Sequence, residues 1–128
     1  MQVYLYCADL YCQQCGEVIR TRLDKAGIPI VSMNNHVFDK DDEYSYDSDE
    51  YPKGPYPDGG GEADYPQHCG SGPDCVNAIE LSDGRNIGVW LENDLTAQGI
   101  EYVREAIRQG GEVAKLWEEY YANVLDVD

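Results

Sequence analysis

The positions of the five cysteines constrain what this chain can fold into more strongly than any other feature of its sequence. They fall into two clusters on either side of a long polar segment: Cys7, Cys12 and Cys15, then Cys69 and Cys75. The two-residue spacer between Cys12 and Cys15, followed by Gly16, is typical of a zinc knuckle, in which both sulfurs face one ion. Tetrahedral coordination needs two more ligands, and the second cluster supplies the natural pair. We therefore predict one structural Zn²⁺ ion, with these ligands: Cys12, Cys15, Cys69 and Cys75.

One cysteine and one histidine are further candidates near this site. Cys7 lies on the core side of a predicted strand, which favours packing over metal binding. His68 directly precedes Cys69, and adjacent side chains seldom reach one ion together, so we assign it a supporting place beside the ligands. An odd number of cysteines without an export signal argues against disulfides, because cytosolic reductants keep thiols reduced. The alternative to a metal is that the cysteines are buried small side chains or a redox pair.

The net charge limits which partners the chain can bind. Lys and Arg total 9 against 25 Asp and Glu, so the formal charge at pH 7 is −16. Such a surface repels phosphate and anionic lipid, which disfavours direct binding to nucleic acids or membranes and favours a basic protein surface. The N-terminal residues have no basic leader, and no run approaches the about 20 apolar residues of a membrane span. We expect a soluble, cytoplasmic protein.

The length predicts one α+β domain, 1–128, and the first elements follow from the residue pattern. Alternation in residues 1–7 predicts a strand with Val3, Leu5 and Cys7 on one side. Residues 28–33 are compatible with a second short strand.

Between these strands, the apolar positions change to helical spacing over residues 14–26. The predicted apolar face consists of Val18, Ile19, Leu23 and Ala26. Arg20 is predicted to point away from that face, and Gly27 is predicted to end the helix.

The C-terminal half contains the clearest local signals. Asp83-Gly84 lies between two alternating runs and predicts a β-hairpin over residues 76–92. Thr96 is placed to cap a helix over 97–109, which Gly110 ends. A last helix, 112–124, has a broad apolar stripe, which is compatible with a homodimer.

Residues 39–67 form a Pro/Gly/Tyr-rich acidic segment that we predict to be a long loop. It carries ten acidic residues against two lysines, together with four of the six prolines and five tyrosines. With almost no aliphatic side chain, it cannot build a core of its own. A connection of this length is either mobile, pinned along the domain by its tyrosines, or ordered by a partner.

Motifs for catalysis and nucleotide binding are missing from the sequence. It has neither the HExxH pattern nor the deaminase pattern of a catalytic zinc. Gly59-Gly60-Gly61 lacks the lysine of a phosphate-binding loop, and the acidic run 47–50 has Pro52 where a calcium loop needs glycine. A thiol-redox or metal-dependent enzyme is therefore the least favoured class.

Three stretches resemble a group of small, acidic, uncharacterised cysteine-rich proteins encoded by bacteriophages and prophages. They are YLYCADLYCQQCGE, YDSDEYPKGPYPDGGGEADYPQHC and VWLENDLTAQGIEYVREAI. The resemblance implies a bacterial host and a cysteine metal site that maps onto Cys12, Cys15, Cys69 and Cys75, but no activity. The chain departs from the group in its second pair, where five residues instead of two separate the cysteines.

Charge and resemblance together suggest a non-enzymatic accessory protein that binds a basic host protein surface. It would act as a nucleic-acid mimic that inhibits a host defence complex, in the manner of an anti-CRISPR protein. The candidate partner-binding residues are Asp41, Asp42, Glu43, Tyr44, Tyr46, Asp47, Asp49, Glu50 and Tyr51. The alternative is a zinc-stapled regulatory or interaction module whose acidity only serves solubility.

Overall fold

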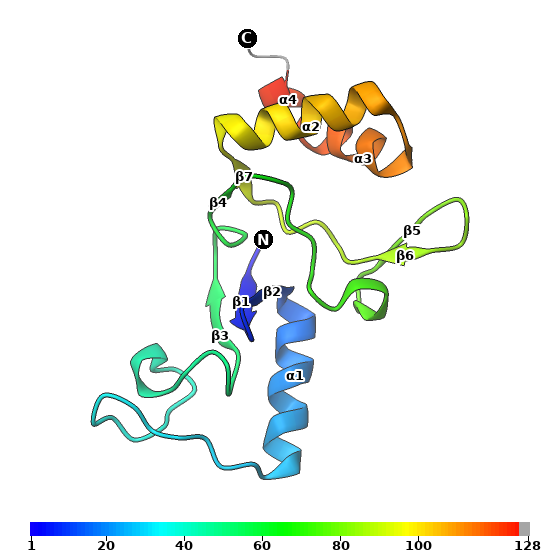
Figure 1. The fold of residues 1–128 in the computed structure, drawn as a ribbon. Coiled ribbons are helices and arrows are strands. Elements are labelled where there is room, and N and C mark those ends of the chain that lie inside the picture. Colours follow the sequence, from blue (N-terminus) through cyan, green and yellow to red (C-terminus); the bar gives the residue numbers. More distant parts are fainter. Residues whose placement is uncertain (126–128) are drawn as a thin grey trace.

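The computed structural model describes residues 1–125, and residues 126–128 of the predicted single domain lie outside that part. Figure 1 shows an elongated α+β molecule, with a small sheet and α1 towards one end and three helices at the other. The helices are α1 (Gln13–Ala26), α2 (Ala97–Gln109), α3 (Glu112–Tyr120) and α4 (Ala122–Leu125). The strands are β1 (Val3–Tyr6), β2 (Asp9–Cys12), β3 (Lys53–Tyr56), β4 (Glu62–Ala63), β5 (Ile79–Glu80), β6 (Asn86–Ile87) and β7 (Asp94–Leu95).

The N-terminal strand is confirmed, and it forms the centre of an antiparallel sheet with the order β2-β1-β3. Val3, which is completely buried, lies opposite Cys12 on β2 and opposite Tyr56 on β3. The prediction that Cys7 faces the core is wrong. Cys7 lies in the turn between β1 and β2 with a positive φ of 50°, and its side chain is exposed, because the strand already ends at Tyr6.

Helix α1 matches the predicted bounds within one residue, but the face that it buries overlaps the predicted one only in part, at the half-buried Ile19 and Leu23. Its buried residues are Cys15, Gly16 and Arg20, whereas Val18 is 45% exposed. Gly16 lies directly on the ring of Tyr4, where a Cβ would come within 2.2 Å of Cδ2. This close approach turns the glycine towards β1 and leaves Val18 exposed at the side of the helix.

The second predicted strand, over 28–33, does not form. Its backbone donors are taken by the acidic segment: Val31 donates to the Glu50 carboxylate at 2.8 Å, and Met33 donates to the carbonyl of Ser45 at 3.0 Å. Asn34 and Asn35 then adopt positive φ values of 56° and 62°, which reverse the chain.

The acidic segment 39–67 is folded, and its tyrosines pin it to the rest of the domain. Tyr46 and Tyr51 are 1% and 2% exposed and pack edge to face on each other and on Phe38, with ring centroids 5.2–5.6 Å apart. The segment also supplies β3 to the sheet and β4, which pairs in parallel with β7. The segment is therefore a long loop interrupted by two short strands, and it matches the alternative of a loop pinned by its tyrosines, because aromatic rings supply the core that aliphatic residues do not.

The predicted hairpin over 76–92 is confirmed with short strands, since β5 and β6 pair over two residues each. The cap of α2 is also confirmed, because the Thr96 hydroxyl accepts from the Gly99 amide at 3.0 Å. The predicted helix 112–124 is divided at Tyr121 into α3 and α4. Tyr121 is buried, and its hydroxyl accepts a 2.6 Å hydrogen bond from the Trp90 indole.

Among the described residues, none of the helices combines the length and the apolar character that crossing a membrane requires.

Candidate metal centre

The structure brings together the four predicted ligands, although 53 residues lie between Cys15 and Cys69 in the sequence. The sulfurs of Cys12, Cys15, Cys69 and Cys75 all lie within 4.8 Å of one another. Each of these residues is at most 6% exposed, and none forms a disulfide. This spacing allows four sulfurs to surround one ion, so the group is a candidate metal site.

Local structure explains how each pair is placed. Cys12 ends β2 and is the cap residue of α1, so Cys15 follows it in the first turn on the same side. Cys69 is fixed by its amide, which donates to the carbonyl of Val89 at 2.8 Å. A short 3₁₀ turn over Gly72–Asp74 then returns the chain to Cys75. The longer second spacer thus curls around the sulfurs, as the zinc prediction requires.

Backbone amides of the two loops point at the sulfurs. The Cys12 amide donates to Sγ of Cys69, and the Val76 amide donates to Sγ of Cys15, both at 3.3 Å. Each of these bonds joins one cysteine cluster to the other. Hydrogen bonds of this kind stabilise a thiolate more than a thiol, so they favour the ligand form of the sulfurs.

Asn77 completes the set of donors and was not singled out from the sequence. Its amide lies 3.4 Å from Sγ of Cys75, and its side-chain nitrogen lies 3.8 Å from Sγ of Cys12. The same side-chain nitrogen donates to Gln14 at 3.0 Å. Every sulfur of the group therefore has an N–H donor from the other cluster or from the turn after Cys75.

The electrostatics of the group favour a bound cation. Burial raises the pKa of Cys12 and of Cys69, because a thiolate is poorly solvated there and lies close to other sulfurs. Burial also acts to raise the pKa of Cys15, but hydrogen bonds from Ser71 and from the Val76 amide outweigh it and lower that pKa. Four clustered thiolates need a compensating positive charge, which a divalent ion supplies.

The two further candidates lie outside the sulfur cluster. Cys7 is exposed, and its sulfur lies 3.5 Å from the carbonyl of Asp49. His68 uses both ring nitrogens elsewhere: Nδ1 lies 2.8 Å from the carbonyl of Gly88, and Nε2 lies 3.0 Å from the indole nitrogen of Trp117. In this arrangement His68 joins the hairpin and α3 beside the cysteines, which agrees with a supporting place and not with a ligand.

Arg20 is the main residue that the sequence pattern misplaced. Its guanidinium is buried, donates to the carbonyl of Pro52 at 2.9 and 3.0 Å, and also bonds to the carbonyls of Lys40 and Gly54. The group lies 4.7 Å from the ring centre of Tyr4. Arg20 therefore fastens the acidic segment to α1. Arg20 lies one turn after Gly16, whose backbone packs against Tyr4 of β1.

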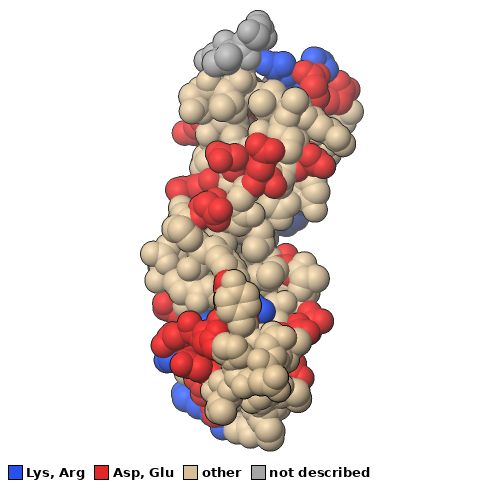
Figure 2. All heavy atoms as spheres, turned by 90° about the vertical axis from the view of Figure 1, so that its left-hand side faces the viewer, with Lys and Arg blue, Asp and Glu red and all other residues tan. Residues whose placement is uncertain are grey.

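The candidate partner-binding residues divide by exposure. Tyr46 and Tyr51 are buried, so they cannot act as anchors for a partner without unfolding the segment. Asp42, Glu43 and Glu50 are partly exposed. The exposed members are Asp41, Tyr44, Asp47 and Asp49. Figure 2 shows acidic side chains in several separate groups on the face beside β3, with uncharged surface between them.

No protein family model, no curated protein and no solved structure matches the chain.

Proposed function

We propose that this chain is a non-enzymatic binding module held together by a structural Zn²⁺ ion. The observation that carries the proposal is the buried four-sulfur group, in which every sulfur also accepts an N–H donor. Zn²⁺ suits this site because it takes four sulfur ligands in a closed tetrahedron and undergoes no redox chemistry. Bound there by Cys12, Cys15, Cys69 and Cys75, it would cross-link the start of α1 to the loop before the hairpin.

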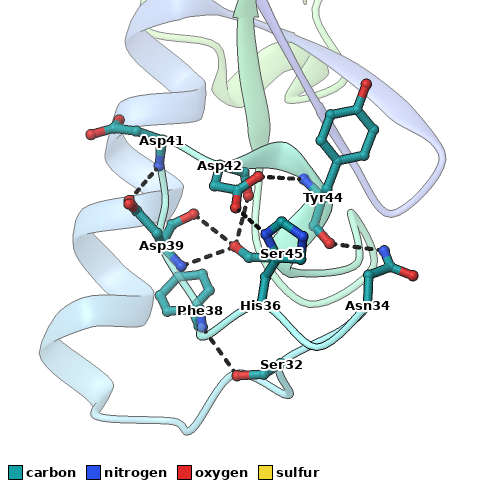
Figure 3. Close-up of polar contacts among 9 residues, drawn as sticks. All are labelled: Ser32, Asn34, His36, Phe38, Asp39, Asp41, Asp42, Tyr44 and Ser45. Carbon is teal, nitrogen blue, oxygen red and sulfur yellow. Dashed lines mark hydrogen bonds and ion pairs between the residues drawn. The ribbon is translucent and has the colours of Figure 1, made fainter.

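The surface that we propose for binding is the acidic segment, directed at a basic protein surface. Figure 3 shows how its carboxylates build their own frame: Asp42 lies 2.8 Å from Nδ1 of His36 and accepts from the Tyr44 amide at 3.1 Å. The Asp39 backbone is bonded in turn to the hydroxyl of Ser45. Charges on a rigid frame lose little conformational entropy on binding, which is what mimicry of a nucleic acid needs.

The phage-type setting implied by the sequence resemblance makes a host defence complex, such as a CRISPR effector complex, the proposed target. A cationic nucleic-acid channel would be attracted to a protein of charge −16 over long range. The bound module would then exclude the nucleic acid from that channel.

Metal analysis with thiol titration on the purified protein tests the zinc scaffold. We expect about one Zn²⁺ per chain, with only the exposed Cys7 reacting rapidly in the native protein. A metal-free native protein with five reactive thiols would contradict the proposal. A redox protein would differ in another way, because alkylation of Cys15 would then leave the fold intact.

Charge substitution tests the binding surface. The variant with Asp41→Asn, Asp47→Asn and Asp49→Asn removes exposed carboxylates without touching the buried tyrosines. We expect it to lose most of its retention on a purified CRISPR effector complex, and the loss should shrink as salt rises. The matched control neutralises three exposed acids on the helices: Glu101, Glu118 and Glu119. Equal retention of both variants would favour the alternative in which acidity serves only solubility.

A further inference from the structure

Helix α1 carries an apolar face that nothing in the described part of the chain covers. Val18 is 45% exposed on this helix, and Val76, next to the cysteine loop, is 60% exposed. Both residues line the same two adjoining hollows, so they form one continuous apolar surface. An exposed apolar surface of this kind on a small protein is typical of an interaction site.

The two adjoining hollows together form a groove between α1, the β1–β2 hairpin and the cysteine loop. One hollow has a volume of about 390 Å³, and the other, which runs along α1, has a volume of about 610 Å³. The apolar lining residues of the groove are Tyr6, Tyr11, Val18, Ile19, Leu23 and Val76. Cys15 and Ser71 lie on its wall, so the sulfur group shapes one side of the groove.

The charges beside the groove are unlike those of the rest of the molecule. Arg22 and Lys25 lie along it, and within residues 1–125 neither forms a hydrogen bond or an ion pair. Glu17 and Asp74 also lie at its edge, and Glu17 already accepts from Gln13 at 3.3 Å. In a chain of charge −16, this is a neutral surface with two unpaired cations near the end of α1.

We propose that this groove binds an amphipathic helix of a partner protein, with acidic residues along the edge that faces Arg22 and Lys25. A helix-in-groove contact requires an apolar floor and complementary charges at the rim, and both are present. The 14 residues of α1 span about 21 Å, which matches roughly four turns of a docked helix. The inference rests on the proposed zinc scaffold only where the cysteine loop forms a wall of the groove.

Two synthetic helical peptides of about 15 residues, or four turns, provide the probe. Both have the same leucine face, but one has glutamates along its edges and the other lysines. Long-range attraction to a chain of charge −16 favours the lysine peptide, whereas the groove favours the glutamate peptide. We expect the glutamate peptide to bind the zinc-loaded protein at least about tenfold more tightly at the groove. Amide NMR shifts at Val18 and Val76 report that site.

Variants of the full chain sharpen the test. Val18→Asp should weaken binding of the glutamate peptide at least about tenfold, because a carboxylate enters the apolar floor. Arg22→Glu with Lys25→Glu should reverse the preference between the peptides. The matched control is Val37→Asp, which changes a valine that is 85% exposed and outside the groove, and it should bind like the wild type.

Three results would overturn the proposal: no shift at Val18 and Val76 with either peptide, the same shifts with tighter binding of the lysine peptide, or a concentration-dependent dimer that Val18→Asp converts to monomer. The last result would show that a second copy covers the groove. Zinc content is measured on every sample. A folded, metal-free sample that still binds the glutamate peptide would contradict the zinc scaffold while supporting the groove.

Discussion

Helix α1 is fastened to the rest of the protein at two places that work by different physics. At its N-terminal end, four buried sulfurs from two distant clusters meet within 4.8 Å. One turn beyond Gly16, the buried Arg20 binds carbonyl groups of the acidic segment and lies between the rings of Tyr4 and Tyr51. In the proposed zinc scaffold the first place would depend on an ion, whereas the second is built from the chain alone.

The two places should respond differently to the loss of a single side chain. A metal site with four ligands is close to all-or-none, because a remaining set of three thiolates repels itself and binds the ion much more weakly. The Arg20 site is graded, since each hydrogen bond and each ring contact adds a separate small term. We therefore expect the cysteine centre to control whether the domain folds, and the Arg20 site to control how firmly the acidic segment is held.

Loss of the metal should have the largest effect. Cys69→Ser or removal of the ion by a chelator should unfold the region around the cysteine loop, because zinc binding contributes about 10–16 kcal/mol in small zinc domains. Circular dichroism during chelation, with recovery on adding Zn²⁺, measures this change. Cys7→Ser is the matched control and should leave metal content and unfolding unchanged, since Cys7 is exposed and outside the group. Equal loss in both variants would show that the four-sulfur group does not control the fold.

Removal of the Arg20 guanidinium should have the next largest effect. Arg20→Ala removes the guanidinium donors from the carbonyl of Pro52, which keeps only the 3.3 Å bond from the Tyr46 hydroxyl, and we expect the free energy of unfolding to fall by about 3 kcal/mol. Urea unfolding of the zinc-loaded protein measures it. Arg22→Ala is the control, because Arg22 is exposed, and it should change stability by less than about 0.5 kcal/mol. Metal content should stay near one ion per chain in both variants, and its loss in Arg20→Ala would show that the two places are coupled.

Alkaline pH should weaken the Arg20 site, because this site includes the phenol of Tyr51. Burial, followed by the neighbouring Asp24 carboxylate, raises the pKa of Tyr51 from 10.0 to about 12. The folded state therefore holds the phenol proton more tightly than the unfolded state. The resulting stabilisation is complete below pH 10 and is lost as the pH rises from 10 to 12, by up to about 3 kcal/mol. Urea unfolding at intervals above pH 9 should show a steeper decline for the wild type than for Tyr51→Phe. Identical slopes in the wild type and in Tyr51→Phe would contradict this role of Tyr51.

The smallest expected effect is at the frame of the acidic segment. His36→Ala removes the contact between His36 and Asp42. Because these two side chains are 51% and 32% exposed, the free energy of unfolding should fall by less than about 1 kcal/mol. Thermal unfolding measures the change. Asn35→Ala is unsuitable as a control, because Asn35 has a positive φ. Asp41→Ala is the better control, since its side chain is exposed. A loss as large as that of Arg20→Ala would mean that the frame, and not Arg20, holds the segment.

The cysteine centre was predictable from sequence because metal ligands leave a chemical signature. The CxxCG string and the second pair identify the four residues without knowledge of the fold, and the structure places them together. The caps Thr96 and Gly27 were readable for a similar reason, since each acts on its immediate neighbours.

The Arg20 site could not be predicted in the same way. Helical periodicity assigned the buried face to Val18 and Ile19, but the contact of Gly16 with Tyr4 and the burial of Cys15 and Arg20 shift that face, so that Ile19 is partly buried and Val18 is exposed. The failed strand at 28–33 and the ordered tyrosines have the same origin. Their partners lie in a segment whose composition predicts only a loop, so the burial depends on contacts that no local pattern records.

The two fastenings of α1 are nested along the chain, which orders the steps of folding. The contact from Arg20 to Pro52 closes 32 residues, whereas the contact between Cys15 and Val76 closes 61 and encloses the first. Closing the inner circuit first shortens the free chain that the outer circuit must still close, and so reduces its entropic cost. During synthesis on the ribosome, the inner circuit can form while the second cysteine pair is still untranslated. Ion capture would then be the closing event, sealing an acidic lobe that is already in place.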